Sequence, residues 1–139
     1  MRTLGDLNWI NEYVGIPYRW GGRDFSGADC YGLAVLVYRE EFGIHLADWI
    51  GSEIDLRGRE SRIAEVVTSG EFEEVDSPVE DGTFCVCYRS RIAHHLGLYF
   101  GGFVLHSHRT TGCVYEPLDR FVSQYGKVKF GWWTPDVED

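Results

Sequence analysis

The chain has 139 residues, of which 44% are hydrophobic and 15% aromatic, and its formal net charge is −9. This composition predicts a single folded domain over residues 1–139 and excludes a disordered chain. The acidic balance argues against nucleic acid or an anionic membrane surface as a partner, and no apolar run is long enough to span a membrane.

The N-terminal segment carries no recognisable targeting signal. Residues 1–6 lead into mixed polar and apolar residues without the apolar stretch of a secretory signal, so we expect synthesis in the cytoplasm without a signal peptide. Apolar residues at helical spacing predict a first helix over residues 4–14. Gly15-Ile16-Pro17 ends this helix, because proline disfavours the helical conformation of the residue before it.

A cysteine stands where a glycine-rich loop, residues 18–29, meets the second predicted helix. Apolar residues at helical spacing predict this helix from Cys30 to about Phe42, and Gly43 is typical of a helix C-terminus. Asp29 is a favourable N-cap residue. The positive end of the helix dipole lowers the pKa of a thiol, so Cys30 is a candidate nucleophile.

The second half of the chain changes from helical to strand periodicity. Residues 53–69 are predicted as a helix after an irregular segment, and residues 70–82 as an acidic, solvated loop. Alternating residues then predict five strands, over residues 83–88, 94–100, 103–107, 113–116 and 127–133. A short helix is predicted over residues 119–125, before the last strand. Helices followed by a run of strands predict an α+β fold with a mainly antiparallel sheet.

Four of the five histidines gather around Gly101-Gly102, which predicts a two-residue hairpin turn. Counting back from that turn pairs Gly97 with His106 and His95 with His108, all on one face of the sheet. His95 is then the central imidazole, because it can reach either of the other two. A thiolate needs such an imidazole as its base, and the base needs a third group to orient it. Geometry leaves His106 and His108 open for that third role.

The remaining histidines and cysteines have other interpretations. His94, at the alternate position, is predicted to point to the opposite face of the sheet. The three imidazoles that share a face are also an alternative zinc site. Cys85, Cys87 and Cys113 are predicted to be small core residues without disulfides, as in a reducing compartment.

Four motifs, in this order along the chain, resemble those of the NlpC/P60 cysteine peptidases, which hydrolyse the stem peptides of the bacterial cell wall. The motifs lie at residues 15–22, 27–33, 81–83 and 95–107, and the resemblance extends over about residues 15–133. It implies a papain-like α+β fold, in which N-terminal helices pack on a mainly antiparallel sheet of five to six strands. The helix after the cysteine looks closest to the branch found in phage tails and gene-transfer particles.

The resemblance also implies roles by position. Cys30 matches the nucleophile and His95 the general base, whereas His106 matches the residue that orients the base, which decides against His108. Tyr18 matches a tyrosine that contacts the nucleophile, and its hydroxyl and the Cys30 backbone N–H are candidate donors to an oxyanion. Substrate contacts are expected from four residues around the cysteine: Asp29, Tyr31, Trp20 and Arg19.

The motifs depart from the common family pattern after the nucleophile. Tyr31 stands where cell-wall hydrolases commonly carry serine and where the phage branch carries an aromatic residue, which favours the phage branch. A second departure is Asp81-Gly82, where the family often has the two residues in the reverse order. It has no bearing on the residues that match the triad.

The residues and the resemblance together predict a cysteine endopeptidase that acts without cofactor or metal. The resemblance implies that it cleaves a D-glutamyl–diaminopimelate type of bond in peptidoglycan. We expect it to be incorporated in or delivered by a phage or prophage tail, with cell-wall peptide and other tail proteins as its partners. One alternative is a catalytically silent structural tail-assembly protein on the same fold. Another is a different acyl-transfer enzyme, such as an amidase or a transglutaminase-like protein.

Overall fold

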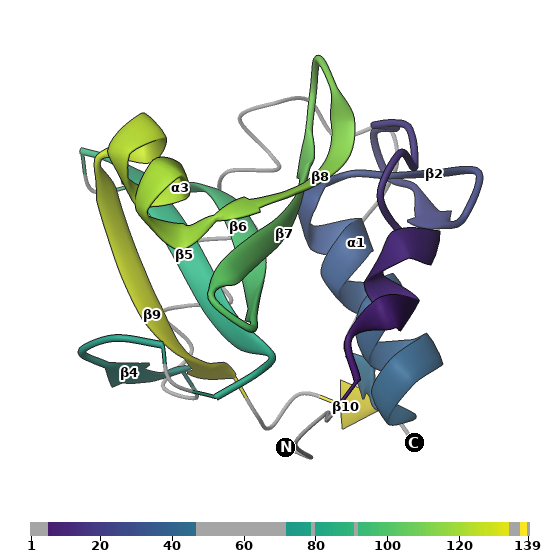
Figure 1. Ribbon diagram of the computed structural model, residues 1–139, viewed down its shortest axis with the longest axis horizontal. Helices are drawn as coiled ribbons and strands as arrows, with labels where there is room; N and C mark the ends of the chain where they lie inside the picture. Colours follow the sequence, from purple (N-terminus) through teal and green to yellow (C-terminus); the bar gives the residue numbers. More distant parts are fainter. Residues whose placement is uncertain (1–5, 47–71, 79, 91, 134–136, 139) are drawn as a thin grey trace.

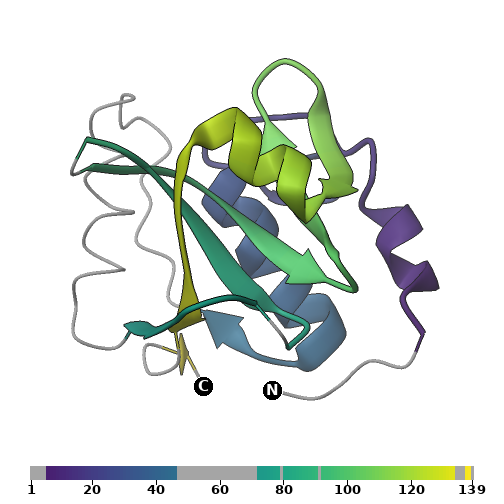
Figure 2. The same cartoon turned by 60° about the vertical axis from the view of Figure 1, so that its left-hand side comes forward.

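The computed structural model describes residues 6–46, 72–78, 80–90, 92–133 and 137–138. A six-stranded antiparallel sheet forms the centre, with α1 (Cys30–Val37) against one face and α3 (Leu118–Tyr125) against the other (Figures 1 and 2). Across the sheet the strands follow the order β4 (Phe72–Val75), β9 (Lys127–Trp133), β5 (Thr83–Arg89), β6 (Ile92–Phe100), β7 (Phe103–His108) and β8 (Gly112–Pro117). The predicted α+β fold with a mainly antiparallel sheet is confirmed.

The helix predicted from Cys30 to about Phe42 is present, but only its first part, α1, is α-helical. The Asp29 carboxylate caps it by accepting the backbone N–H of Gly32 at 2.7 Å. The helix continues as a π-helical turn, η2 (Tyr38–Phe42), and ends at Gly43, whose φ of 67° lies in the left-handed region that favours glycine. All residues of α1 are buried, so it packs on every side. No helix in the described part of the chain is long and apolar enough to cross a membrane.

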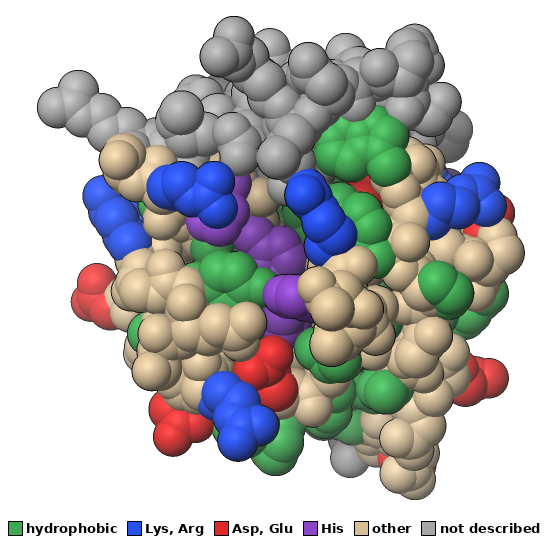
Figure 3. All heavy atoms as spheres, turned by 90° about the horizontal axis from the view of Figure 1, so that it is seen from above, with side chains coloured by type: hydrophobic (Ala, Val, Ile, Leu, Met, Phe, Trp, Pro, Cys, Tyr) green, Lys and Arg blue, Asp and Glu red, His purple; other side chains and the backbone are tan. Residues whose placement is uncertain are grey.

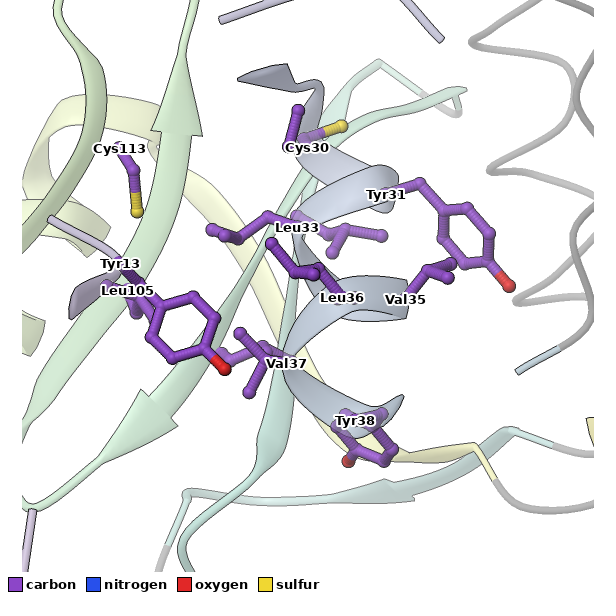
Figure 4. Close-up of a cluster of buried hydrophobic side chains, with 14 of the residues drawn as sticks. Tyr13, Cys30, Tyr31, Leu33, Val35, Leu36, Val37, Tyr38, Leu105 and Cys113 are labelled. Carbon is purple, nitrogen blue, oxygen red and sulfur yellow. The ribbon is translucent and has the colours of Figure 1, made fainter. Parts of the chain in front are cut away.

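The sheet separates two apolar layers. On the α1 side, Figure 4 shows Tyr13 and Leu105 facing Val37, whereas Tyr31 leaves the opposite side of the helix. These four side chains are all buried. The layer on the α3 side is smaller and has four buried members: Cys85, Cys87, Val104 and Phe121. Because both faces are covered, the central strands carry apolar residues at consecutive positions.

The first helix is shorter and tighter than predicted. Instead of an α-helix over residues 4–14, the structure has a 3-10 helix, η1 (Asn8–Glu12), and residues 4–5 lie outside the described part. Ile10 is the buried residue of this helix, and two further turns with hydrogen bonds between residues three apart follow it, from Tyr13 N–H to Ile10 and from Ile16 N–H to Tyr13. The chain then leaves the helix because the backbone N–H of Gly15 donates to the carbonyl of Cys113 in β8, at 2.8 Å.

The acidic segment contains a strand, so the prediction of a solvated loop over residues 70–82 is wrong at residues 72–75. Strand β4 pairs with β9 at the edge of the sheet, where Glu74 lies opposite Gly131. The Glu74 side chain is exposed and pairs with Lys129 Nζ at 3.9 Å. Charged side chains are common on edge strands, where they discourage pairing with a further chain. The helix predicted over residues 53–69 lies outside the described residues.

The five predicted strands are confirmed, and so is the hairpin register at the three residue pairs next to the turn. Each strand begins and ends within two residues of its predicted limits. Tyr99 pairs with Val104 across the turn, as counted from the sequence. Gly101 and Gly102 have φ values of 60° and 95°, which a tight hairpin turn of the favoured type requires and which glycine adopts without strain.

Strand β6 has a bulge just before its central histidine. Cys87 of β5 pairs with His95, but the next residue, Tyr88, pairs with Ala93. His94 is therefore an extra residue on β6. A bulge interrupts the strict alternation of side chains and re-aims those beside it. Two shorter strand pairs complete the fold: β1 (Arg23–Asp24) with β2 (Gly27–Ala28), and β3 (His45–Leu46) with β10 (Val137–Glu138).

Candidate active site

Two histidines meet on the adjacent strands β6 and β7. His95 Nε2 lies 3.0 Å from His106 Nδ1, and the two rings are nearly perpendicular. Gly97 makes this approach possible, because a Cβ at that position would lie 3.0 Å from His106 Cβ and 2.6 Å from Val104 Cγ1. The predicted proximity of the two imidazoles is confirmed. Both are buried, with 7% of His95 and 1% of His106 exposed.

Glu116 of β8 contacts the far side of His106. Its Oε2 lies 2.6 Å from His106 Nε2. Val114 is paired with His106, so Glu116, two residues further along β8, points to the same face. Burial lowers the pKa of His106, and the hydrogen bond and charge of Glu116 act against that shift. Sequence patterns do not single out Glu116, because residues 109–111 are not a recognisable hairpin turn and give no register for β8.

His108 lies beside this pair but makes a different contact. Its Nδ1 accepts a hydrogen bond from the backbone N–H of Thr110 at 3.1 Å, and its ring centroid is 6.5 Å from that of His106. The hydrogen bonds to His95 and Glu116 engage both ring nitrogens of His106, which leaves neither for a zinc ion. Among the residues that the structure describes, no three His, Cys, Asp or Glu side chains are grouped to hold a metal.

Helix α3 covers the histidine pair. The ring of Tyr125 stacks on His95, with centroids 4.8 Å apart and planes 18° apart. Phe121, one turn earlier, meets the ring of His106 at 4.8 Å. His94 also approaches Tyr125, at 6.2 Å, although alternation predicts that it points to the opposite face. That prediction is wrong, because the bulge places His94 and His95 on the same side.

Cys30 reaches the same end of the sheet from α1. The hydroxyl of Ser107 donates to the carbonyl of Ala28 at 2.7 Å, which ties β7 to the segment directly before Cys30. Helix α1 packs on β6 and β7, the two strands that carry the histidine pair. Burial raises the pKa of Tyr125, which stacks on His95, and the charges of Cys87, Glu116 and Cys30 act in the same direction. Cys30 itself is only 1% exposed.

Asp29 holds the glycine-rich loop against the start of α1. Its buried carboxylate accepts hydrogen bonds from the backbone N–H groups of Gly21 at 2.9 Å and Gly32 at 2.7 Å. Arg23 Nη1 donates a third, at 3.0 Å, and forms an ion pair with it. Both carboxylate oxygens are thus engaged within the protein. Its predicted contact with substrate stays a proposal.

The other residues predicted around the nucleophile differ in exposure. Arg19 is exposed, and Tyr18 and Trp20 are half-buried. Tyr31 is buried, with the guanidinium carbon of Arg23 5.6 Å from its ring centroid. Arg19, Tyr18 and Trp20 are therefore open to solvent at least in part, whereas Tyr31 is part of the core. The roles predicted for all four residues stay proposals.

The other three cysteines are free and buried, as predicted for core residues. Burial raises the pKa of Cys85, of Cys87 and of Cys113, the last to about 12. They are therefore neutral thiols near neutral pH, and a neutral thiol is a poor nucleophile. Only Cys30 among the four begins a helix.

A surface pocket of about 340 Å³ adjoins the histidines. It is lined by Tyr88, Arg89, His94, Gln124 and Tyr125. Tyr125 also stacks on His95, so the pocket lies next to the central imidazole. Figure 3 shows histidine side chains gathered at the surface of this end of the molecule, with hydrophobic, Lys and Arg side chains beside them.

Comparisons with known proteins agree with this fold. The model of the NlpC/P60 family matches residues 15–130. One similar solved structure is the NlpC/P60 domain of the peptidoglycan hydrolase SagA, with a TM-score of 0.59 and 21% identity over 89% of this chain and 92% of that one. Another is an NlpC/P60 family protein from Bacillus cereus, with the same TM-score and identity over 88% of this chain and 37% of that one.

A shorter match links the chain to a curated protein. Protein P54 of Enterococcus faecium is 45% identical over 38 residues. That match covers 27% of this chain and only 7% of the length of the relative. It therefore indicates a shared segment and not a shared overall organisation.

Proposed function

The chain belongs to the NlpC/P60 family, and we propose that it is a cysteine peptidase that hydrolyses peptide bonds of peptidoglycan. The observation that carries the proposal is the 3.0 Å contact between His95 and His106, at the end of the sheet where α1 begins with Cys30. A thiol at a helix N-terminus, an imidazole and a group that orients the imidazole are the parts of a thiol acyl-transfer site. SagA, which contains a domain of this fold, is described as a peptidoglycan hydrolase, which supports the substrate class.

The proposed reaction proceeds through an acyl-enzyme. His95 takes the proton of the Cys30 thiol, and the sulfur attacks the carbonyl carbon of the scissile amide. The backbone N–H of Cys30 and the hydroxyl of Tyr18 are the proposed donors to the oxyanion. His95 then protonates the leaving amine as the C–N bond breaks. Water, deprotonated by His95, hydrolyses the thioester to a carboxylate and restores the thiol, while His106 keeps the ring of His95 oriented.

The finer substrate proposal is the bond between the side-chain carboxyl of D-glutamate and the diamino acid of the stem peptide. It rests on the family resemblance. Stem peptides carry carboxylates, and Arg19 is an exposed cation on the loop before the nucleophile. We propose that Arg19, Trp20, Asp29 and Tyr31 shape this subsite. Asp29 and Tyr31 are buried, so they would act by supporting the residues at its surface.

The biological setting is also a proposal. The aromatic residue at Tyr31 and the sequence of the helix that follows support a phage or prophage tail, in which the protein cuts the cell wall with other tail proteins as partners. The alternative is a silent structural tail-assembly protein that keeps the fold without the reaction. The buried contact between His95 and His106 favours the enzyme.

Peptide cleavage tests the proposal directly. Purified protein is incubated with a stem peptide that contains diaminopimelate, and the products are identified by mass spectrometry. We expect cleavage on the carboxyl side of D-glutamate, lost in Cys30→Ala and retained in the matched control Cys113→Ala. Cleavage that survives in Cys30→Ala contradicts the thiol mechanism. A folded wild-type protein that cleaves no stem peptide supports the structural alternative.

A further inference from the structure

We propose that Glu116 is a positioning residue of this site: through His106, it fixes the ring of His95 so that Nδ1 is the nitrogen left to take the thiol proton. The inference rests on the proposed thiol chemistry of Cys30 and adds a residue that the triad of Cys30, His95 and His106 does not contain. It comes from the contacts that His106 makes on its two sides.

The three side chains form a line across three adjacent strands. His95 on β6 contacts His106 on β7 at 3.0 Å, and His106 contacts Glu116 on β8 at 2.6 Å. The inner member, His106, is 1% exposed, and the side chain of Glu116 is 14% exposed. Water therefore has little access to either hydrogen bond. Each side chain is held by a strand and not by a mobile loop, as an oriented site requires.

The carboxylate of Glu116 determines which ring nitrogens of His106 and His95 carry protons. An ionised carboxylate can only accept hydrogen bonds, so Nε2 of His106 must donate to Glu116. In the neutral imidazole of His106, Nδ1 then has no proton and accepts. The donor to it is Nε2–H of His95, because the two nitrogens are 3.0 Å apart. Neutral His95 is therefore the tautomer with the proton on Nε2 and a lone pair on Nδ1. A general base needs such a lone pair to accept a proton.

Glu116 also has an electrostatic effect. When His95 takes the thiol proton it becomes an imidazolium, and its positive charge is shared with the hydrogen-bonded His106. A carboxylate next to His106 stabilises that charge, and hence the thiolate–imidazolium pair, more strongly in a buried site than in water. Loss of the charge with retention of the hydrogen bond should therefore reduce the fraction of reactive thiolate.

Other titratable groups lie around the pair. They are His94 in the bulge of β6, Cys87 opposite His95 on β5, His108 on β7 and Tyr125 on α3, with Cys30 at the start of α1. Burial raises the pKa of Cys87 and of Tyr125, so both are neutral near neutral pH. Neither replaces Glu116 as a source of negative charge beside the imidazoles.

The first experiment measures the thiol without a substrate. The rate at which iodoacetamide alkylates Cys30 is followed from pH 4 to 10 in wild type, in Glu116→Gln and in the control Glu74→Gln, which removes an exposed carboxylate from the same sheet. The amide keeps an acceptor for His106 but removes the charge. We expect the alkylation rate of Glu116→Gln near pH 6.5 to fall about tenfold, with wild-type behaviour in Glu74→Gln. An unchanged pH profile in folded Glu116→Gln overturns the proposal.

A second measurement needs no variant. Nitrogen-15 NMR of the wild-type imidazoles reports which ring nitrogen carries the proton. We expect the proton on Nε2 in both His95 and His106. A proton on Nδ1 of neutral His106 overturns the proposal even where Glu116→Gln fails to fold.

Hydrolysis separates this inference from the proposed function. In a protein that cleaves stem peptide, Glu116→Gln should lower kcat by about 10- to 100-fold and leave KM within about threefold, because the charge acts on the reacting groups and not on the substrate. A wild-type protein that cleaves no stem peptide but shows the pH shift in alkylation refutes the substrate and retains the role of Glu116. Cleavage with no pH shift retains the substrate and refutes that role.

Discussion

At the scale of single residues, both ring nitrogens of His106 are engaged, one by the buried His95 and the other by the half-buried Glu116. An imidazole so placed can hold a neighbouring ring but has no free nitrogen of its own to accept a proton from substrate. His108, in contrast, bonds to a backbone N–H in its own turn. The two residues therefore have separable roles.

That difference predicts unequal effects of two alanine substitutions. His106→Ala should lower kcat for stem-peptide cleavage by about 10²- to 10⁴-fold, since His95 loses the partner that orients it. His108→Ala should leave kcat within a few-fold of wild type. Steady-state kinetics, with thermal unfolding as a check on folding, measures both. Loss of turnover in His108→Ala alone would show that the orienting role belongs to His108.

The four thiols should differ sharply in reactivity. Burial keeps Cys85, Cys87 and Cys113 protonated near neutral pH, and Cys30 is the thiol at a helix N-terminus. We expect one fast adduct with iodoacetamide at pH 7, on Cys30, and three more only after unfolding in urea. Peptide mapping by mass spectrometry gives the order. Rapid labelling of Cys113 in the folded protein would contradict this.

At the scale of elements, the hairpin of β6 and β7 requires a glycine at residue 97, where there is no room for a side chain. A methyl group at residue 97 would lie 2.6 Å from Val104 Cγ1 and 3.0 Å from His106 Cβ. Gly97→Ala should therefore destabilise the protein by about 1–3 kcal/mol and also lower activity, because His106 must move. Urea unfolding and kinetics on the same sample measure the two effects.

A second substitution tests the cause. Val104→Ala removes the nearest clashing carbon, so in a double-mutant cycle the cost of Gly97→Ala should be smaller in the Val104→Ala background. Strictly additive costs would show that the destabilisation comes from the strand backbone and not from the contact with Val104.

Local patterns predicted most elements and missed those whose partners lie far along the chain. The strands from residue 83 onward alternate clearly, and Gly101-Gly102 set the register of one hairpin. Strand β4 has no such pattern, because it is an acidic edge strand that forms only by pairing with β9. Spacings of three and four residues both count as helical in a sequence, so the pattern predicts an α-helix where the structure has a 3-10 helix with one buried residue, Ile10.

The candidate site also contains residues that local patterns predict and residues that they do not. The motifs point to Cys30, His95 and His106, and the hairpin count places the two histidines together. Glu116 could not be found in this way, because the connection before β8 gives no register. The approach of His94 to Tyr125 depends on a bulge, and a bulge is not visible in an alternating sequence.

At the scale of the whole molecule, weak acids are buried on both sides of the sheet. Burial raises the pKa of three thiols and five phenols: Cys85, Cys87, Cys113, Tyr13, Tyr38, Tyr88, Tyr115 and Tyr125. The folded state therefore keeps protons that the unfolded state has lost at alkaline pH. For Cys113, whose pKa is raised from 9.0 to about 12, stability is full below pH 9 and is lost as the pH rises through 12.

We therefore expect the stability of the folded protein to fall steeply at alkaline pH. Between pH 9 and 11 the free energy of unfolding should fall by at most roughly 1 kcal/mol per pH unit for each of the three buried thiols, and by less for the phenols. Urea midpoints measured from pH 7 to 11 under reducing conditions give the slope. Cys113→Ala should make it less steep. A midpoint that stays level up to pH 11 would contradict the assignment of these groups as buried and neutral.

The contacts from His95 on β6 through His106 on β7 to Glu116 on β8 depend on the register of all three strands. Side chains alternate between faces, so a slip of β8 by one residue would turn Glu116 away from His106 while leaving most backbone pairing intact. A compact chain with that error would be impaired as an enzyme. Under the proposed role of Glu116, full hydrolytic activity requires the correct alignment of all three strands, and it should therefore appear only after the sheet has formed without a register error.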